Sequence, residues 1–540
     1  MAGADDNPKS EAEQDRGNML ARAGIVGAGT LVSRVLGLAR DVVLAAVFTR
    51  EETDAFFVAF TIPNALRQLL GEGAVSSAVV PLLAAKLSTD GDDAAKRFYA
   101  RARGASLVAL ALATILGVVF ARPLAELFAS GYHDRPAEFE RTVELTRLVF
   151  PYIFFVGSAA LGMAALNVKR KFAVAAFAPG LLNVAFLVAH GVDRAYALAY
   201  GALAGGLLQV AAQWPALRGI GYATRPVFAF RDPDVRQIFR RIAPLTFGIG
   251  VYYIDLILSR RFLSELGPGA QSYFTWASRV CDFPQGIFVM ALSTASLPAL
   301  SSLAARGDHD ELSKTYAQGM RLAMFVAIPA SAGLVALAGP LTVALFQRGE
   351  FDSTAAYETS RALIWQGAGI WTIAAVRQLV PVFYALGDTR TPVIVSAIDL
   401  IAFIVLAVTL KGPMGHVGIS IAVGGSSAVQ MVLLFVGLKR RLGSMRWAEV
   451  GASVARTLVA SAVAGVGGWG AARLVTPADG AGVASAGSIA RLVPGVFGGV
   501  VFVVLFLFAA WGMRAPELEL LLGGLRRRLA RRGRAKRSGS

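Results

Sequence analysis

The chain has few of the side chains that most metal and catalytic sites need. It contains one cysteine, Cys281, and four histidines in 540 residues. One cysteine excludes an internal disulfide and a multi-cysteine metal site, so we expect Cys281 to be an inert buried thiol. The sequence has no Walker loop, and no histidine stands near a serine or cysteine in a recognisable catalytic arrangement. We therefore expect no enzyme, no metal site and no cofactor.

Charged residues are also scarce, at 16% of the chain, whereas about a quarter is typical of soluble proteins. Hydrophobic residues make up 55%, and the mean hydropathy is +0.57. A membrane-spanning helix needs about 20 mostly apolar residues, so the chain has room for roughly a dozen or more. Its apolar runs are continuous and do not alternate as in a β-barrel. The composition predicts an all-α integral membrane protein.

Fourteen apolar segments follow one another along the chain. They are 22–49, 54–85, 104–129, 147–168, 172–190, 195–217, 238–263, 270–303, 317–338, 359–387, 392–410, 415–438, 449–473 and 492–512. An even number of spans places both termini on one side. The loops on that side carry 22 Lys and Arg residues and the opposite loops carry 12, so we expect both termini in the cytoplasm. The first twenty residues do not have a signal-peptide pattern, so the first span should stay in the mature protein.

The net charge of +17 would suggest nucleic-acid binding in a soluble protein. Here the basic residues lie in short loops and in the tail 526–537, where membrane topology and anionic lipid explain them. We therefore expect membrane lipids as partners and no nucleic acid.

The second half of the chain resembles the first at a nearly constant spacing: Phe56-Phe57 matches Tyr273-Phe274, and Pro123-Leu124 matches Pro340-Leu341. Two six-helix lobes around a central cavity, with two further C-terminal helices, fit the count. The predicted divisions are a polar tail 1–21, a first lobe 22–218, a linker 219–237, a second lobe 238–441, two helices in 442–512 and a basic tail 513–540. Repeated halves with a substrate site at mid-membrane are a common transporter design. The alternative is an old duplication kept for packing alone.

Four arginines lie inside predicted spans: Arg34, Arg40, Arg67 and Arg279. Facing lipid, they would together cost on the order of 10–14 kcal/mol, so they should face a wet cavity or carboxylate partners. The nearby acids are Asp41, Asp54, Glu72 and Asp282. They are too few and too scattered to neutralise the arginines tightly, and a basic cavity favours an anion such as a diphosphate or carboxylate. The alternative is that some of these arginines extend to lipid headgroups.

Two lone carboxylates, Asp255 and Asp399, lie in other apolar segments. They are candidates for binding a coupling cation or proton, or for a structural role through hydrogen bonds. The stretches 71–73 and 282–286 interrupt their segments with glycine or proline at corresponding depths, which predicts either cavity-lining backbone or a kink.

Several motifs resemble the MurJ (MviN) family, which are bacterial lipid II flippases of the MOP exporter superfamily. The motifs are Ser33-Arg34-Val35-Leu36-Gly37-Leu38-Ala39-Arg40-Asp41, Asp54-Ala55-Phe56-Phe57, Ile62-Pro63-Asn64-Ala65-Leu66-Arg67, Phe150-Pro151-Tyr152-Ile153, Gly339-Pro340-Leu341-Thr342 and Asp388-Thr389. They occur in the family's order between about residues 22 and 440, and the tail spans are similar only in number and hydrophobicity.

The resemblance implies fourteen helices in two lobes around a cavity, with a groove beside the last two helices for a polyprenyl tail. The family's cavity arginines correspond to Arg34, Arg40, Arg67 and Arg279, and Asp54 corresponds to an acid at the outer gate. The chain departs from the family at Thr61 and Ser278, where a basic and an acidic residue are frequent. Its span 392–410 also lacks the Asn and Asp pair of sodium-binding members, so the resemblance does not support cation coupling through Asp255 and Asp399.

The sequence thus predicts a flippase in the bacterial inner membrane that moves lipid II to the periplasmic leaflet by alternating access, in peptidoglycan synthesis. The membrane potential or a coupled ion would drive it, and cell-wall synthases are possible partners. The alternatives are a MOP-type exporter of another polyprenyl-linked oligosaccharide or a small molecule, a membrane enzyme acting on polyprenyl phosphates, and a scaffold that does not transport.

Overall fold

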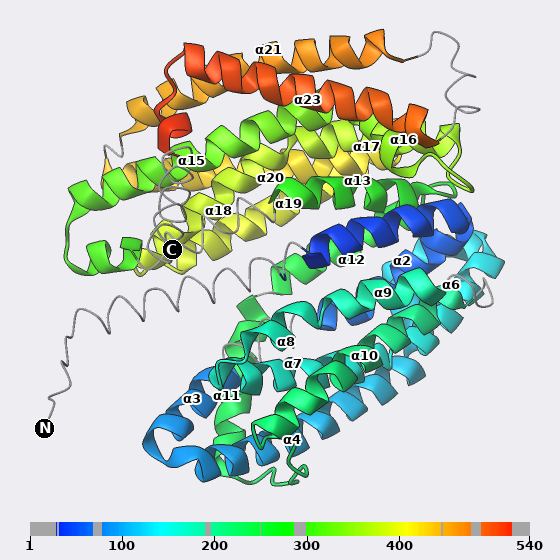
Figure 1. The fold of residues 1–540 in the computed structure, drawn as a ribbon, viewed down its shortest axis with the longest axis vertical. Coiled ribbons are helices and arrows are strands. Elements are labelled where there is room, and N and C mark those ends of the chain that lie inside the picture. The colour runs from blue at the N-terminus through cyan, green and yellow to red at the C-terminus, as the bar shows by residue number, and fades with distance from the viewer. Residues whose placement is uncertain are drawn as a thin grey trace, which may run out of the picture. The chain divides into compact units, whose positions relative to one another are not determined.

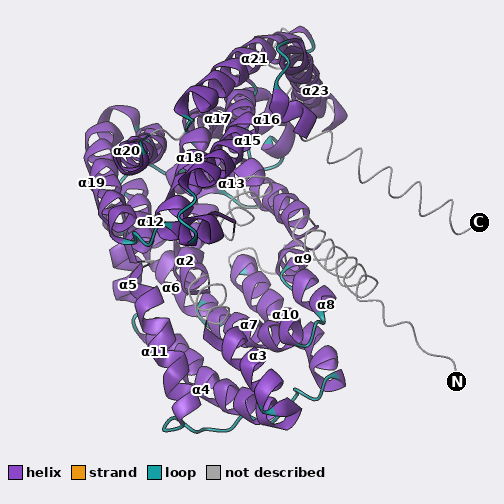
Figure 2. Cartoon of the chain, turned by 90° about the vertical axis from the view of Figure 1, so that its left-hand side faces the viewer, coloured by secondary structure: helices purple, strands orange, loops and turns teal. Residues whose placement is uncertain are grey.

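The computed structural model describes residues 29, 32–67, 78–189, 196–248, 250–285, 299–443, 446–476 and 488–520. Helices are the only regular elements in these ranges, and Figure 2 contains no strand in them. The prediction of an all-α protein is therefore confirmed. Contacts divide the chain into two compact units, Met1–Glu265 and Leu266–Ser540.

The first unit begins with a helix over residues 32–47. It continues with α2 (Arg50–Arg67), α3 (Val80–Thr89), α4 (Gly91–Val119), α5 (Ala121–Phe128), the 3-10 helix η2 (Ser130–Asp134), α6 (Pro136–Val149), α7 (Tyr152–Val168), α8 (Phe172–Phe177), α9 (Gly180–Ala189), α10 (Ala197–Gly219), α11 (Pro233–Gly248) and α12 (Gly250–Ser264). Within this unit α7 packs against both α4 and α10 (Figure 1). Pro136 begins α6, where a proline loses no helix hydrogen bond, and Pro151 separates α6 from α7.

The second unit is also helical throughout its described residues. Its helices are α13 (Ala270–Pro284), a helix over 299–305, α15 (His309–Ala336), α16 (Ala338–Phe346), α17 (Ser353–Ala368), α18 (Ile370–Ala385), α19 (Arg390–Met414), α20 (His416–Leu442), α21 (Trp447–Leu474) and α23 (Ser488–Gly512). α19 pairs with α20. α21, which is orange in Figure 1, pairs with α23, which is red there.

Helix boundaries repeat between the two units. The number of residues that separates Phe56 from Tyr273 also separates the end of α4 from the end of α15. It likewise separates the start of α6 from the start of α17. With one additional position, it relates the start of α7 to the start of α18. In both units a long helix is followed by a short one, α5 or α16, which begins after a single residue and holds the matched Pro-Leu pair. The predicted internal repeat is confirmed at the level of individual helices.

Each of the fourteen predicted segments contains described helix, and eight spans meet the length and composition of a membrane crossing. These are Gly91–Val119, Pro136–Val168, His309–Ala336, Ser353–Ala385, Arg390–Met414, His416–Leu442, Trp447–Leu474 and Ala490–Gly512. The protein is therefore a multi-pass membrane protein. The total of fourteen spans stays a prediction.

Two predicted boundaries differ from the structure for identifiable reasons. α4 starts at Gly91, well before the apolar segment that begins at 104, because acidic residues in its first turn suit a helix N-terminus. The segment 172–190 is divided into α8 and α9 at residues 178 and 179, where Pro179 cannot continue the backbone ladder.

The segment 220–232, which lies within the predicted linker 219–237, packs across α4. The Val227 amide donates to the Ala100 carbonyl at 3.0 Å, and the Arg103 Nη1 donates to the Thr224 carbonyl at 2.6 Å. Arg101 forms an ion pair with Asp232 at the end of this segment. These contacts explain why α11 follows within the first unit. The predicted lobe boundaries themselves stay a prediction.

A buried carboxylate fixes the last described residues to the second unit. Glu517, 1% exposed, accepts hydrogen bonds from Arg321 of α15 at 2.6 Å and from Ser453 of α21 at 2.9 Å. Burial raises the pKa of Glu517, but hydrogen bonds from its own backbone, from Arg321 and from Ser453 outweigh this and hold the pKa below its usual value. The chain after α23 is thereby attached to α15 and α21.

Candidate functional site

The helix over residues 32–47 carries an ion pair between neighbours in the sequence. Arg40 donates to the same Asp41 oxygen through Nε at 2.8 Å and through Nη2 at 2.6 Å. The two side chains are 12% and 4% exposed. A charge that is so shielded needs a partner of opposite sign. Asp41 thus serves as a charge partner of Arg40.

An asparagine that sequence reasoning missed completes this cluster. Asn183 of α9, 6% exposed, accepts from Arg40 Nη1 at 3.1 Å and donates to the Ser33 carbonyl at 2.9 Å. The Phe186 ring, one turn further along α9, lies 5.4 Å from the Arg40 guanidinium carbon. An amide inside the apolar segment 172–190 was the available signal. Together these contacts fix the orientation of the guanidinium.

Arg34 and Arg67 belong to the same unit. Arg34 is half-buried on the helix that carries Arg40. Arg67 ends α2, and its Nε donates to the Asn64 side chain at 3.0 Å. Arg67 and Arg40 both act electrostatically on the buried Tyr152 at the start of α7. The first unit therefore brings Arg40 and Arg67 toward one tyrosine.

Arg279 and Asp282, which were predicted for the anion site, lie on α13 of the second unit. Arg279 Nη1 is 3.9 Å from Asp282, and these side chains are 37% and 58% exposed. This ion pair is looser and more accessible than the Arg40–Asp41 pair. Cys281 between them is buried and reduced. α13 ends at Pro284, at the predicted interruption.

Asp54, predicted at the outer gate, is buried in α2 at 1% exposure. It acts electrostatically on Tyr132 of η2, together with Glu138, Arg135 and Arg260. Burial is the main cause that raises the pKa of Tyr132 well above its ordinary value, and the two carboxylates add to it.

The end of α12 is hydrogen-bonded to the same part of the first unit. Arg135 donates to Glu138 at 2.5 Å and to the Ser264 carbonyl at 2.8 Å, and the Ser264 hydroxyl accepts from the Gly131 amide at 3.1 Å. Asp54 therefore lies beside a packed polar network rather than in open solvent.

The remaining predicted residues are separated. Asp255 is half-buried on α12 of the first unit, and Asp399 is half-buried on α19 of the second. Glu72 and the stretch 71–73 lie outside the described residues. Within the described ranges, no group of three or more His, Cys, Asp or Glu side chains could hold a metal ion.

Further arginines lie within helices that qualify as membrane spans, among them Arg377 of α18 and Arg456 of α21. The search for charges in apolar segments could have found both, because Arg377 falls in 359–387 and Arg456 in 449–473. Cations held within spans by carboxylates, amides and aromatic rings suit the binding of an anionic group.

The fold matches that of known membrane transporters. A solved structure described as lipid II flippase MurJ in an inward closed conformation aligns over 90% of this chain and 99% of that chain, with a TM-score of 0.72 and 21% identity. An inward-facing MATE family multidrug transporter of the MOP superfamily aligns over 77% of this chain and 95% of that one, with a TM-score of 0.60 and 14% identity. The chain thus has the helical fold of these membrane proteins.

Sequence comparison identifies the family. The family model for lipid II flippase MurJ matches residues 44–484. A Burkholderia cenocepacia protein named lipid II flippase MurJ is 36% identical over 423 residues, which cover 76% of this chain and 82% of that protein. The chain belongs to the MurJ family, as its motifs had indicated.

Proposed function

We propose that the protein translocates lipid II from the cytoplasmic to the periplasmic leaflet of the bacterial inner membrane, as a transporter and without catalysis. The observation that carries this proposal is the 36% identity to a relative of that name over most of both chains. Lipid II carries a diphosphate, which is the kind of group that arginine binds through two parallel hydrogen bonds.

Arg34, Arg40, Arg67 and Arg279 are the residues that we propose bind the diphosphate and the acidic peptide. The contacts of Arg40 support this role, because Asp41 and Asn183 hold its guanidinium in one orientation. An arriving diphosphate would compete with Asp41 for the same N–H groups. The carboxylate would thus stabilise Arg40 in the absence of substrate, and the substrate would replace it.

The proposed direction of transport depends on the side of the membrane on which the termini of the protein lie. The basic loops and the basic tail support cytoplasmic termini, with Asp54 near the outer gate. Transport by alternating access is consistent with the repeated halves. The membrane potential supplies energy for transport, since moving one charge across 100 mV yields about 2.3 kcal/mol. Asp255 and Asp399 are the residues to test for ion coupling, and cell-wall synthases are the partners to test.

Depletion of the protein tests the substrate assignment. Lipid II exposed on the outer leaflet is measured with a toxin that cleaves it only from outside the cell. We expect total lipid II to rise while the cleavable fraction falls. An unchanged cleavable fraction in a strain without another flippase would contradict lipid II as the substrate and favour another polyprenyl-linked oligosaccharide.

The variant Arg279→Ala tests the proposed site. We expect it to lower lipid II transport at least tenfold with an unchanged amount of protein in the membrane, because a charge-assisted contact to the diphosphate is lost. Arg122→Ala is the matched control, since Arg122 is half exposed and forms an ion pair with Glu140 of α6, within the first unit. Full transport by Arg279→Ala would exclude Arg279 from the site.

A further inference from the structure

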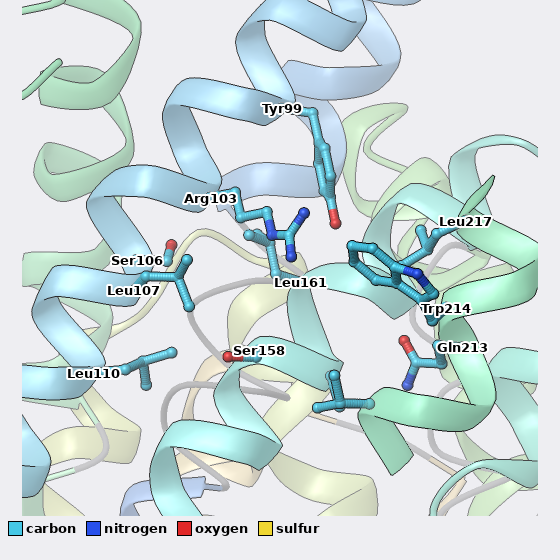
Figure 3. A pocket seen from close by; sticks show the side chains of 12 residues that line it. Tyr99, Arg103, Ser106, Leu107, Leu110, Ser158, Leu161, Gln213, Trp214 and Leu217 are labelled. Carbon is cyan, nitrogen blue, oxygen red and sulfur yellow. The ribbon is translucent and has the colours of Figure 1, made fainter. Parts of the chain in front are cut away.

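A small cavity lies inside the first unit, separate in the sequence from the predicted arginines. It is lined by side chains of α4, α7 and α10, and its volume is about 30 Å³. A cavity needs roughly 10–15 Å³ for one water molecule, so about two particles of that size fit. Figure 3 shows the Tyr99 hydroxyl, the Arg103 guanidinium, the Trp214 ring and the Gln213 amide around this space.

Gln213 is the residue that requires a ligand there. It is 1% exposed, and neither its amide nitrogen nor its amide oxygen has a hydrogen-bond partner among the described residues. A buried polar atom that has lost its hydrogen bonds to water and has no partner in the protein destabilises the fold. The glutamine at the matching position of the repeat, Gln430 of α20, donates to the Ser396 hydroxyl at 3.1 Å. Among the described residues, the glutamine thus has a hydrogen-bond partner in the second unit but none in the first.

The charge around the cavity is positive. Arg103 contributes a guanidinium, and none of the twelve lining residues is acidic. In the described part of the chain Arg103 has no carboxylate partner: its Nη1 donates to the Thr224 carbonyl, and the guanidinium lies 5.2 Å from the centre of the Trp214 ring. A cation would be repelled here, whereas an anion would be attracted.

We propose that this cavity binds one monovalent halide-sized anion, such as chloride, together with one water molecule. The anion accepts hydrogen bonds from the Gln213 Nε2 and from the Arg103 guanidinium. The water donates one hydrogen to the Gln213 Oε1 and the other to the anion. This arrangement satisfies both amide atoms, gives Arg103 a counter-charge and uses the room for two particles.

The size of the cavity excludes larger occupants. A lipid phosphate with its substituents is larger than the space for two water-sized particles. Two water molecules alone would satisfy Gln213 but would leave the charge of Arg103 without a counter-ion inside the lobe. The two-water arrangement is therefore the alternative that the experiment must distinguish.

Bromide is the probe for the test. Crystals of the full-length protein are grown in sodium bromide, and anomalous diffraction is recorded at the bromine absorption edge. We expect an anomalous peak between Gln213 and Arg103. An ordered solvent peak without anomalous signal at this place would mean that water alone fills the cavity, and would overturn the proposal.

A solution measurement uses variants with a matched control. The Tm of the full-length protein is measured in sodium chloride, sodium bromide and sodium gluconate at equal ionic strength. A halide whose Kd is about tenfold below its concentration should raise the Tm by roughly 1–2 °C over gluconate. Gln213→Leu and Arg103→Gln should lose this difference, whereas Gln430→Leu should keep it. A halide effect that persists in Gln213→Leu, or is absent from the unaltered protein, would contradict the proposal.

This test is independent of the proposed function, because neither readout involves lipid II. Trp214 offers a third signal, since bromide close to an indole quenches its fluorescence. The quenching by bromide should be smaller in Gln213→Leu than in Gln430→Leu, and equal quenching in the two variants would argue against bound bromide beside Trp214.

Discussion

The two units share a helical template but use charged side chains differently. In the first unit Arg40, whose side chain is 12% exposed, pairs with Asp41 inside the helix over 32–47 and is held by Asn183. In the second unit the enclosed pair is Arg321–Glu517, which joins α15 to the chain after α23. The internal repeat aligns helix ends between the units, but it aligns neither of these pairs.

This difference indicates what a duplication keeps and what it changes. The backbone pattern depends on apolar faces, prolines and short connections, which tolerate many sequences. Ion pairs depend on single residues and can be gained or lost in one half. The first unit thus uses its enclosed arginine where we propose substrate binding, and the second unit uses its enclosed arginine to attach two additional helices.

The largest expected effect concerns this attachment. Arg321→Met leaves Glu517 buried without its cation, and the loss of one partner of a buried pair costs about 3–5 kcal/mol. We expect α21 and α23 to separate from α15 at lower temperature than in the unaltered protein. Limited proteolysis after residue 443, as a function of temperature, measures this separation.

Arg122→Met of the first unit is the matched control for that prediction. Arg122 and Glu140 also form an arginine–glutamate pair, but both are about half exposed. Such surface pairs contribute about 0–1 kcal/mol. If Arg321→Met were as stable as Arg122→Met, the second unit would hold its additional helices by apolar packing alone.

Matched glycines sharpen the comparison at a smaller scale. Gly131 and Gly349 each lie shortly after the short helix of their unit, α5 or α16, but glycine is needed there for different reasons. A Cβ on Gly131 would lie 2.4 Å from the Glu265 amide nitrogen, so the backbone near the end of α12 would have to move. Gly349 has a φ of 57°, which costs other residues roughly 1–2 kcal/mol.

Alanine and asparagine at each of the two positions distinguish these reasons. Gly131→Ala should cost about 1–3 kcal/mol of unfolding free energy through overpacking, and Gly131→Asn should cost more because its side chain is larger. Gly349→Asn should cost less than Gly349→Ala, because asparagine tolerates a positive φ. Chemical denaturation of the purified variants measures both orders, and the same order at the two positions would mean that the glycines serve one purpose.

The sequence predicted the class of fold because its signals are strong and local. Long apolar runs, the internal repeat and the motif around Arg34 and Arg40 each appear without knowledge of contacts. Helix starts were less predictable, since α4 extends into a charged stretch stabilised by ion pairs with the segment after α10.

The contacts of the site were only partly predictable. Burial cost identified Arg40, but the sequence did not single out its partner among the nearby acids, because the ion pair with Asp41 depends on the side-chain conformations of two neighbouring residues. Asn183 and Gln213 were missed because a single amide in an apolar segment gives a weak signal. Asn183 is important because its partners are distant in the sequence, and Gln213 because it has no partner among the described residues. Both properties depend on how α9 and α10 pack.

The smallest expected effect is a dependence on pH at the start of α19. Asp388 accepts from the Arg390 and Thr391 amides at 3.0 Å and lies 2.8 Å from Arg441, whereas α8 in the first unit begins without a side-chain cap. The hydrogen bonds from Thr391, followed by the charge of Arg441 and the Arg390 amide, hold the pKa of Asp388 below its usual value, against a smaller opposing effect of burial.

Because the folded state lowers this pKa, the stabilisation by Asp388 is fully present above the unfolded pKa of about 3.9 and is lost as the pH falls through the lower folded value. A capping carboxylate contributes about 1 kcal/mol, so hydrogen exchange at the first turn of α19 should accelerate roughly fivefold on acidification, relative to the intrinsic rate. The first turn of α8 should not change. Asp388→Asn should remove most of the pH dependence at α19 because an amide oxygen still accepts from the backbone but does not titrate. If α8 and α19 responded alike to acid, the difference between the two units at this position would lie in solvent exposure rather than in the cap.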